Sequence, residues 1–296
     1  MDQSSLKRLE AGMKLHEAPR SQKLLSAPLR MGRSILLRKL CAWRSRPMTV
    51  SAKTFWGDRM ELVYPDGVSV GIYQCGFFEA GLTAIFLERV KPGMTVLDVG
   101  AHFGYFTLLA SHLVGPSGHV HAFEPTPGTF NVLSRNVAGR PNVRVNQLAV
   151  YSHRTTLSLT SYDQLPSFNT VGRGNVADED QPALKSTTFE VQSTALDDYV
   201  ASTGVKPDLI KLDAEGAEEQ IFNGMANVME NVRPMITLEV GDVVQGSAGR
   251  SRALVELFLS RGYEPWEYDP ARGRLVTHTL RESYRYDNLL LIPKPT

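Results

Sequence analysis

The sequence predicts an α/β fold with a doubly wound, mostly parallel sheet of the Rossmann-like kind. Segments typical of strands alternate with segments typical of helices from residue 95 onward. The run TVLDVGAHFGYFTLLAS, residues 95–111, is typical of a buried strand that turns through two glycines into a helix. A chain of 296 residues, 42% hydrophobic and 21% charged, is long enough for one large α/β domain with an added segment.

Within this pattern we expect strands and helices in regular succession. The expected strands are residues 95–99, 119–123, 143–150, 208–213, 235–240, 263–268 and 289–292. The expected helices are residues 105–114, 126–136, 217–222 and 251–261. Thr126 is a suitable N-cap, and Pro127 suits the first turn of its helix. Strands that alternate with helices favour a parallel sheet covered on both faces.

Two segments depart from this alternation. Before residue 95 we expect a small β/α extension, in which Pro65, Asp66 and Gly67 form a hairpin turn between two alternating apolar runs. Apolar residues at helical spacing follow, from Phe78 to Arg89. Farther along, residues 155–196 are rich in Ser, Thr, Asn, Gly and Asp, and they predict an inserted hairpin around a polar loop.

Residues 1–50 are expected to form a basic leader, partly helical or disordered, ahead of a main domain of residues 51–296. The leader holds eleven Lys and Arg residues against three acidic residues, although the whole chain has a net charge of only +1. Leucines 29, 36 and 40 and Trp43 would fall on one side of a helix. Three interpretations stay open: a surface helix on anionic lipid or a partner, a loosely ordered segment, or a helix packed on the main domain.

Composition disfavours several classes of protein. Cys41 and Cys75 are the only cysteines, too few for a disulfide framework or a cysteine-based metal site, which favours a reducing, cytoplasmic setting. No stretch approaches the roughly 20 apolar residues of a membrane span, and the first residues lack the apolar core of a signal peptide, so we expect neither a secreted nor a spanning protein. Outside the leader there is no basic stripe with interleaved aromatics, and we expect no nucleic acid partner.

The turn after residue 99 carries the clearest ligand signal. Gly100 permits a turn that a side chain would block, and Gly104 permits close approach of a helix and a ligand. A dinucleotide fingerprint has glycines at its first, third and sixth positions, whereas this turn has Gly100, His102 and Tyr105. Asp98, at the end of the strand, can bond a polar ligand group directly. The combination points to S-adenosylmethionine rather than NAD.

Glu124, at the end of the next expected strand, strengthens this interpretation. An acidic side chain at that place can receive both hydroxyls of a ribose and discriminates against a 2′-phosphate. The opposing interpretation is a charged residue at a strand end, which is common on any sheet.

Four segments, in this order and spacing, resemble the FkbM family of S-adenosylmethionine-dependent methyltransferases. They are VLDVGAHFGYFTLLAS, HAFEPTPGTFNVLSRNV, STALDDYV and PDLIKLDAEGAEEQIFNGM, and the resemblance covers residues 76–292. It implies the class I methyltransferase fold, with a seven-stranded sheet whose last strand is antiparallel, and methyl transfer to hydroxyl oxygens. It also implies that the cofactor is lined by Asp98, Gly100, His102, Gly104 and Glu124, and we add their neighbours Ala101 and Pro125.

Asp213 and Glu215 are the expected proton acceptors. A hydroxyl that attacks a methyl group must lose its proton, and it needs a carboxylate or an imidazole within hydrogen-bond reach. Crowding among the carboxylates of this region is expected to raise the pKa of one of them. His102 could share the transfer of the proton.

The same carboxylates could instead hold Mg²⁺, which takes carboxylate and water ligands and could acidify a bound hydroxyl. Asp213, Glu239 and Asp242 form a possible set of ligands for that ion.

The expected function is therefore S-adenosylmethionine-dependent O-methyl transfer to a small-molecule or glycan acceptor, on a hydroxyl of a sugar or a secondary metabolite. The insertion and four aromatic residues, Phe77, Phe78, Trp266 and Tyr268, are expected to shape the acceptor pocket. Two alternatives stay open: an NAD-dependent oxidoreductase, and a non-catalytic binding module on a methyltransferase fold.

Overall fold

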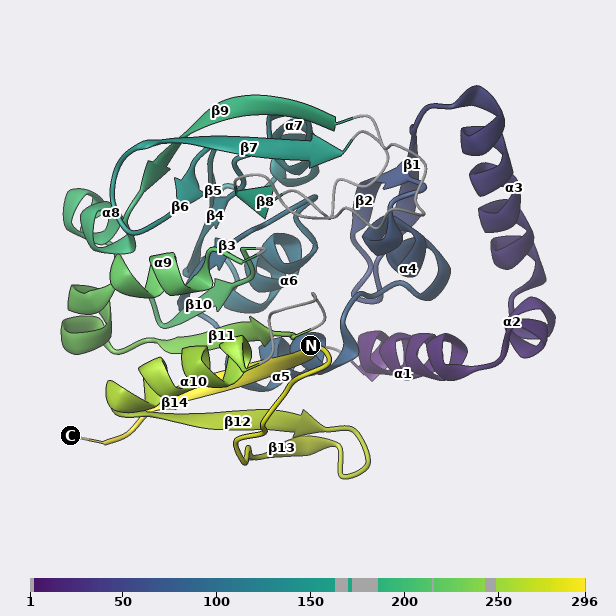
Figure 1. The fold of residues 1–296 in the computed structure, drawn as a ribbon. Helices are drawn as coiled ribbons and strands as arrows, with labels where there is room; N and C mark the ends of the chain where they lie inside the picture. Colours follow the sequence, from purple (N-terminus) through teal and green to yellow (C-terminus); the bar gives the residue numbers. More distant parts are fainter. Residues whose placement is uncertain (1–2, 163–169, 172–185, 215, 243–248, 296) are drawn as a thin grey trace.

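The computed structural model describes residues 3–162, 170–171, 186–214, 216–242 and 249–295. Within these residues, eight strands form a central sheet with helices on both faces (Figure 1). In spatial order the strands are β13 (Arg274–Thr277), β12 (Tyr263–Asp269), β14 (Asp287–Pro293), β11 (Met235–Val240), β10 (Leu209–Leu212), β3 (Thr95–Val99), β4 (His119–Phe123) and β5 (Val143–Asn146). The predicted doubly wound α/β class is confirmed. The last strand, β14, is antiparallel to both of its neighbours, and β13 is added at the edge beyond the seven strands that the resemblance implies.

The order of the strands reverses beside β3. From β3 the chain adds β4 and then β5 on one side, and it later returns to add β10 and β11 on the other side. In an open parallel sheet, ligands bind outside the carboxyl ends of the strands at such a reversal. The fold therefore directs attention to the loops that follow β3, β4 and β10.

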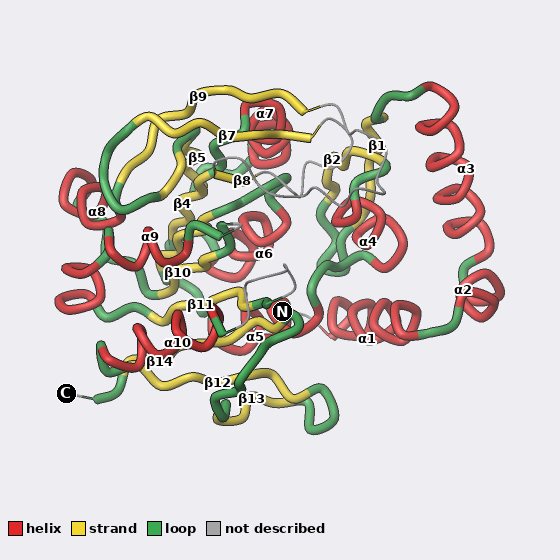
Figure 2. Tube along the Cα trace, in the orientation of Figure 1, coloured by secondary structure: helices red, strands yellow, loops and turns green. Residues whose placement is uncertain are grey.

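The central strands are buried on both faces, as the apolar runs of the sequence require. In β3 and β10, neighbouring residues belong to opposite cores: Val96 and Leu209 pack in one cluster, and Leu97 and Ile210 in the other. Helices α5 (Ala80–Arg89), α6 (Tyr105–Val114) and α7 (Pro127–Val137) cover the first core. The second is covered by α8 (Leu196–Thr203), α9 (Glu218–Asn223), the π-helical turn η2 (Val228–Val232) and α10 (Arg250–Ser260) (Figure 2).

The N-terminal region differs from its prediction at one turn. Strands β1 (Met48–Lys53) and β2 (Arg59–Tyr64) form an antiparallel hairpin, but Gly67 does not lead into a further strand. It begins helix α4 (Gly67–Cys75) instead, because the Asp66 carboxylate accepts a hydrogen bond of 3.1 Å from the backbone N–H of Ser69. The residues predicted as a hairpin turn are therefore a helix N-cap.

Three helices precede β1: α1 (Gln3–Glu17), α2 (Arg20–Ser26) and α3 (Pro28–Arg44). They lie at one end of the molecule, beside α4 and the small hairpin (Figure 1). Helix α1 approaches α4 closely, since a Cβ at Gly12 would lie 2.4 Å from the carbonyl oxygen of Cys75. Leu9 of the same helix is buried in the first core. Among the described residues no single helix could span a membrane; only α4 and α5, bent by 67°, pass that test together, by length and composition alone.

The insertion forms a second sheet, as expected. Strands β7 (Thr156–Tyr162) and β9 (Ser186–Thr194) pair antiparallel, with β8 (Thr170–Val171) beside β7 and β6 (Ala149–Val150) beside β9. The predicted strand at 143–150 is thus divided, because β5 joins the central sheet and β6 joins the inserted one. Most of the polar loop predicted between the hairpin strands lies outside the described residues.

Candidate active site

The turn after β3 is fastened to the neighbouring strands. The backbone N–H groups of Gly100 and Ala101 donate to the carbonyl oxygen of Phe123, at the end of β4, over 3.1 and 3.0 Å. Gly100 has a φ of 73°, and a Cβ there would lie 1.7 Å from the carbonyl oxygen of Asp213. Glycine is therefore required twice at this position, once by the backbone conformation and once by the close approach of the loop after β10.

Glu124 connects the two predicted cofactor loops. Its Oε2 accepts the N–H of His102 over 3.0 Å, and its Oε1 accepts the N–H of Thr126 over 2.9 Å. The side chain is 6% exposed, and burial raises the pKa of Glu124 to about 7. Pro125, also predicted to line the cofactor, follows directly and is partly buried.

Gly104 lies where α6 meets α7. A Cβ at this position would lie 2.6 Å from Cδ1 of Leu133 in α7, and the backbone φ is 91°. The glycine therefore allows α6 and α7 to pack closely, and the predicted close approach of a ligand stays a prediction.

A buried lysine that we did not single out in the sequence organises the centre of the site. Lys211 in β10 lies in register with Asp98 in β3. Its Nζ donates to the carbonyl oxygen of Gly100 over 3.1 Å and to Oδ2 of Asp213 over 3.0 Å, and it lies 3.4 Å from Oδ1 of Asp98. Burial alone would lower the pKa of Lys211, but the carboxylates of Asp213 and Asp98 hold it above its usual value. The sequence feature that could have indicated this role is a single lysine within an apolar strand, residues 209–212 (LIKL).

Asp98 lies near the end of β3, as predicted. Its side chain is completely buried, and Oδ2 accepts a hydrogen bond of 2.5 Å from the hydroxyl of Thr107 in α6. Through Lys211, which also donates to the carbonyl oxygen of Gly100, Asp98 is connected to the glycine turn, and its direct bond to a ligand stays a prediction.

His102 presents unsatisfied polar atoms at this turn. Its φ is 50°, and among the described residues neither ring nitrogen, both of them buried, has a hydrogen-bond partner. Burial lowers the pKa of His102, so the imidazole is neutral at pH 7. The ring lies against Phe103, with 3.8 Å between the ring centroids. A polar ligand group would satisfy these nitrogens.

Of the two carboxylates predicted to accept a proton, Asp213 lies at the site and Glu215 lies outside the described residues. Burial would raise the pKa of Asp213, but the charge of Lys211 and hydrogen bonding with Glu239 hold it below its usual value. Glu218 caps the turn, since its Oε1 accepts the N–H groups of Ala214 and Gly216 over 3.0 and 3.2 Å.

The predicted magnesium ligands are not assembled. Asp213 and Glu239 lie together, but the oxygens of Asp242 accept the backbone N–H groups of Ser251 and Tyr284, each over 3.0 Å. Asp242 thereby connects the start of α10 to the segment before β14. Among the described residues no group of three or more His, Cys, Asp or Glu side chains is arranged to hold a metal ion.

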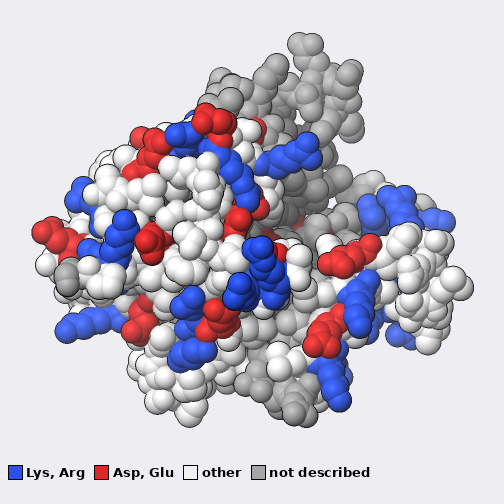
Figure 3. Space-filling view, turned by 90° about the horizontal axis from the view of Figure 1, so that it is seen from below, with Lys and Arg blue, Asp and Glu red and all other residues white. Residues whose placement is uncertain are grey.

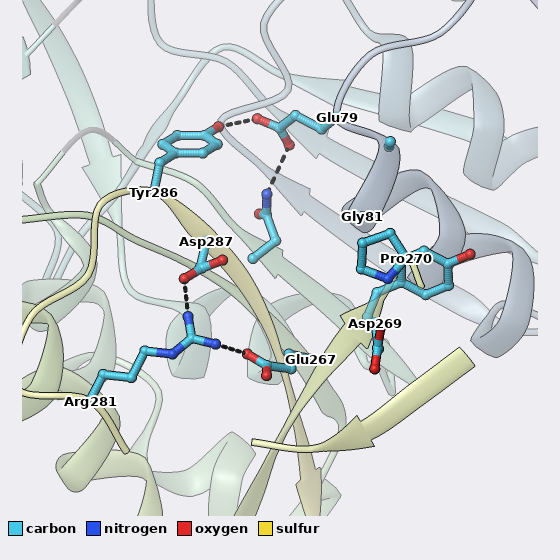
Figure 4. Close-up of a pocket in the computed structure, with 11 residues that line it drawn as sticks. Glu79, Gly81, Glu267, Asp269, Pro270, Arg281, Tyr286 and Asp287 are labelled. Carbon is cyan, nitrogen blue, oxygen red and sulfur yellow. Dashed lines mark hydrogen bonds and ion pairs between the residues drawn. The ribbon is translucent and has the colours of Figure 1, made fainter. Parts of the chain in front are cut away.

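A pocket of about 430 Å³ opens farther along the same edge of the sheet (Figure 4). Strands β11 and β12 both run antiparallel to β14, so the end of β12 and the start of β14 lie at the carboxyl edge of the sheet. The pocket lies between these ends and the start of α5, and most of its lining is polar or charged. It is lined by Glu79, Ala80, Gly81, Glu267, Tyr268, Asp269, Pro270, Arg281, Tyr286, Asp287 and Asn288.

Three of the four carboxylates of this pocket are in ion pairs, but among the described residues Glu79 has no ion-pair partner. Arg281 contacts both Asp287 and Glu267, and Asp269 pairs with Arg272. In the described part of the chain no Lys or Arg lies within ion-pair distance of Glu79, whose partners are the hydroxyl of Tyr286 and, at 3.5 Å, the amide of Asn288. Burial and the like charge of Asp213 raise the pKa of Glu79 to about 7.

The sequence missed Glu79 because it stands alone between an apolar pair, Phe77-Phe78, and the start of α5. Of the four aromatics predicted for the acceptor pocket, Tyr268 lines this one. Phe77 is buried in the first core, and Phe78 and Trp266 pack against that core.

Comparison with known proteins identifies the family. A family model described as the methyltransferase FkbM domain matches residues 98–265. The 31-O-demethyl-FK506 methyltransferase FkbM of Streptomyces tacrolimicus is 30% identical over 222 residues, 64% of this chain and 85% of that protein. The hexuronic acid methyltransferase AglP of Haloferax volcanii is 27% identical over 53% of this chain and 61% of that protein.

A solved methyltransferase FkbM from Methylobacillus flagellatus is 13% identical, with a TM-score of 0.40 over 76% of this chain and 55% of that chain. Because the family model spans more than half of the 296 residues, the chain belongs to the FkbM family of S-adenosylmethionine-dependent methyltransferases.

Proposed function

We propose that this methyltransferase acts on a hydroxyl oxygen of a sugar, a glycan or a secondary metabolite, and that Glu79 accepts the proton of that hydroxyl. The observation that carries the proposal is a carboxylate with a pKa of about 7, without an ion-pair partner among the described residues, in a polar pocket. Asn288 of the pocket lining pairs with Glu239 of β11, and Glu239 hydrogen-bonds with Asp213 in the loop after β10, so the pocket lies close to that loop. Gly100 of the cofactor turn packs against the same loop.

The residues of the glycine turn fit S-adenosylmethionine. The Glu124 carboxylate is fixed by the backbone N–H groups of His102 and Thr126 and by the Thr126 side chain, and it lies beside the glycine turn, where it would accept hydroxyls of the ribose. The two unpartnered ring nitrogens of His102 offer further polar contacts beside it. When bound, the cofactor supplies an activated methyl group on its sulfonium. Asp98 and Lys211 would act from beneath the turn by fixing its backbone.

The pocket suits a hydroxylated acceptor. Its lining offers the carboxylates, the Arg281 guanidinium, the Asn288 amide and the Tyr286 hydroxyl as hydrogen-bond partners, and the face of Tyr268 is suited to a sugar ring. Holding the acceptor oxygen in line with the methyl group supplies most of the reduction of the barrier. Glu79 would then take the proton as the oxygen attacks.

Asp213 is the weaker candidate for this proton. Lys211 and Glu239 hold the pKa of Asp213 below its usual value, whereas the pKa of Glu79 is near the pH at which the reaction would proceed. A base is most effective when its pKa lies near the operating pH.

The names of two relatives support the choice of acceptor. One relative is named as a methyltransferase of 31-O-demethyl-FK506, which has a missing O-methyl group, and another as a methyltransferase of hexuronic acids. Both names fit transfer to oxygen, and the second fits a carbohydrate.

Two measurements test the proposal. Calorimetry against S-adenosylmethionine, S-adenosylhomocysteine and NAD should show binding of the first two only. A panel of sugars, glycans and polyketide alcohols, screened by mass spectrometry with the labelled cofactor, should then yield methyl ethers that survive mild base. Base-labile methyl esters would instead show that a carboxylate is the acceptor, and no turnover across the panel would favour a non-catalytic module. Repeating both measurements with Mg²⁺ and with a chelator tests the magnesium prediction directly.

A further inference from the structure

Exposed apolar side chains gather on the N-terminal helices. Among the described residues, eight large hydrophobic side chains are exposed, and seven of them lie between residues 6 and 43. The seven are Leu6, Leu24, Leu25, Leu29, Ile35, Leu36 and Trp43. Single exposed apolar residues are ordinary, but this concentration marks an interaction surface.

Helix α3 carries an apolar stripe on the side that faces away from the protein. Leu29, Leu36 and Trp43 are seven residues apart, nearly two turns of about 3.6 residues, so they share one side of the helix. They are 77%, 56% and 81% exposed. The opposite side holds the buried residues, among them Ser34, whose hydroxyl lies 3.1 Å from the hydroxyl of Tyr64. The packing of α3 on β2 and α4 therefore leaves its apolar stripe uncovered.

Basic residues border this stripe. Between residues 18 and 46 the sequence contains eight Lys and Arg residues and no Asp or Glu. At helical spacing, Arg33 and Arg44 lie on one flank of the stripe and Lys39 on the other, and all three are exposed. Figure 3 shows this end of the molecule as a white area with blue side chains beside it.

We propose that α2 and α3 dock the protein onto an anionic lipid surface. The docking face consists of Leu29, Leu36 and Trp43 of α3, with Arg33, Lys39 and Arg44 on its flanks, and α2 adds the exposed side chains of Leu24 and Leu25 ahead of it in the chain. An interfacial helix buries an apolar side in the boundary of the bilayer while its Lys and Arg side chains reach anionic headgroups. Trp43, at the end of the stripe, suits the level of the headgroups.

The arrangement of charge disfavours two other occupants. A second copy of the chain would bring two sets of eight positive charges together with no acidic residue in either segment. A nucleic acid needs a row of basic side chains that contact its phosphates. On α3, however, the centre of the exposed side is apolar and the charged residues lie on its flanks.

Vesicle sedimentation tests the proposal with the full chain. The protein should pellet with vesicles of phosphatidylcholine containing about 30% phosphatidylserine, at least about tenfold more strongly than with phosphatidylcholine alone, and high salt should weaken the binding. Brominated lipids should quench the fluorescence of Trp43, which is 81% exposed, whereas Trp56 is buried and Trp266 packs against the first core. Equal or absent binding to the two kinds of vesicle would overturn the proposal.

Two double variants of α3, compared with one control double variant, separate this surface from the rest of the protein. The double variant Leu29→Ser/Leu36→Ser and the double variant Arg33→Glu/Arg44→Glu should each lose most of the vesicle binding, at least about tenfold. The matched control Lys91→Glu/Lys206→Glu makes the same change of charge at exposed positions of the main domain and should bind as the wild type does. Unchanged affinity for S-adenosylmethionine would show that each variant is folded. A wild-type dimer that the leucine variants dissociate, or RNA binding that competes with the vesicles, would assign the face to another partner.

Discussion

Asp213 and Glu79 lie at the same edge of the sheet, but the fold shifts their pKa values in opposite directions. Asp213 lies 3.0 Å from the buried ammonium of Lys211, and its pKa is lowered. Glu79 has no such partner among the described residues, and burial with the charge of Asp213 raises its pKa to about 7. A carboxylate at this edge of the sheet therefore becomes a fixed anion or a proton acceptor according to its burial and the charges around it.

The cluster of Lys211, Asp98 and Asp213 has a structural effect. Lys211 joins Asp98, Asp213 and the carbonyl oxygen of Gly100, so a single ammonium fixes the ends of β3 and β10. The pocket cluster is arranged differently, because Arg281 neutralises Asp287 and Glu267 and leaves Glu79 able to exchange a proton. The first group positions the cofactor turn, and the second faces the proposed acceptor.

The largest expected effect comes from removing the buried cation. Lys211→Met leaves the buried carboxylate of Asp98 and the partly buried carboxylate of Asp213 without their cation and should lower the free energy of unfolding by about 3–5 kcal/mol. Urea denaturation followed by circular dichroism measures this change. The exposed control Lys91→Met should change it by no more than about 0.5 kcal/mol. A small loss for Lys211→Met would show that water reaches this cluster and that it does not hold the turn.

The second effect is on turnover. Glu79→Gln removes the proposed proton acceptor and keeps its shape, so kcat should fall by about 10²–10⁴ while the affinity for S-adenosylmethionine is retained. Asp213→Asn should lower kcat less, because the pKa of Asp213 is already low. A greater loss of kcat in Asp213→Asn, with the free energy of unfolding retained, would return the role of base to Asp213, as the sequence predicted.

The third effect is on pH dependence. Glu79 accepts a proton only when ionised, so kcat should rise as the pH increases through about 7. The free energy of unfolding should fall over the same pH range. Folding raises the pKa of the Glu79 carboxyl, so this group stabilises the native state at pH values below its unfolded pKa, and the stabilisation is lost as the pH rises through about 7. Glu79→Gln should flatten part of that decline. The part that remains is expected from Glu124, whose pKa is also raised to about 7.

The smallest effect concerns the hydroxyl that holds Glu79. The hydrogen bond donated by Tyr286 lowers the pKa of Glu79, so Tyr286→Phe should move the rising limb of the pH profile upward by up to about one unit. Tyr268→Phe makes the same chemical change elsewhere in the pocket lining and should leave the limb in place. Equal shifts in both variants would show that the limb does not report Glu79.

Much of the fold could be predicted from local pattern. The strand that ends at Val99, the glycine turn and α6 follow from a continuous apolar run and two glycines, and the family resemblance was confirmed. The hairpin turn at 65–67 was wrong because Asp66 and Gly67 suit a helix N-cap as well as a turn, and only the cap hydrogen bond to Ser69 distinguishes the two.

The sequence by itself determined the α/β class, the place of the glycine turn and the acidic strand end at Glu124, because each depends on residues close together in the chain. Tertiary structure alone decided the protonation of the site. Tyr286, which hydrogen-bonds to Glu79, lies 207 positions from it in the sequence. Lys211 and Asp98 lie side by side only because of the register of two strands. Asp242 accepts the backbone N–H of Tyr284 and does not join the predicted magnesium ligands. A pKa depends on burial and on charges that folding brings together, and neither can be predicted from the neighbouring residues in the sequence.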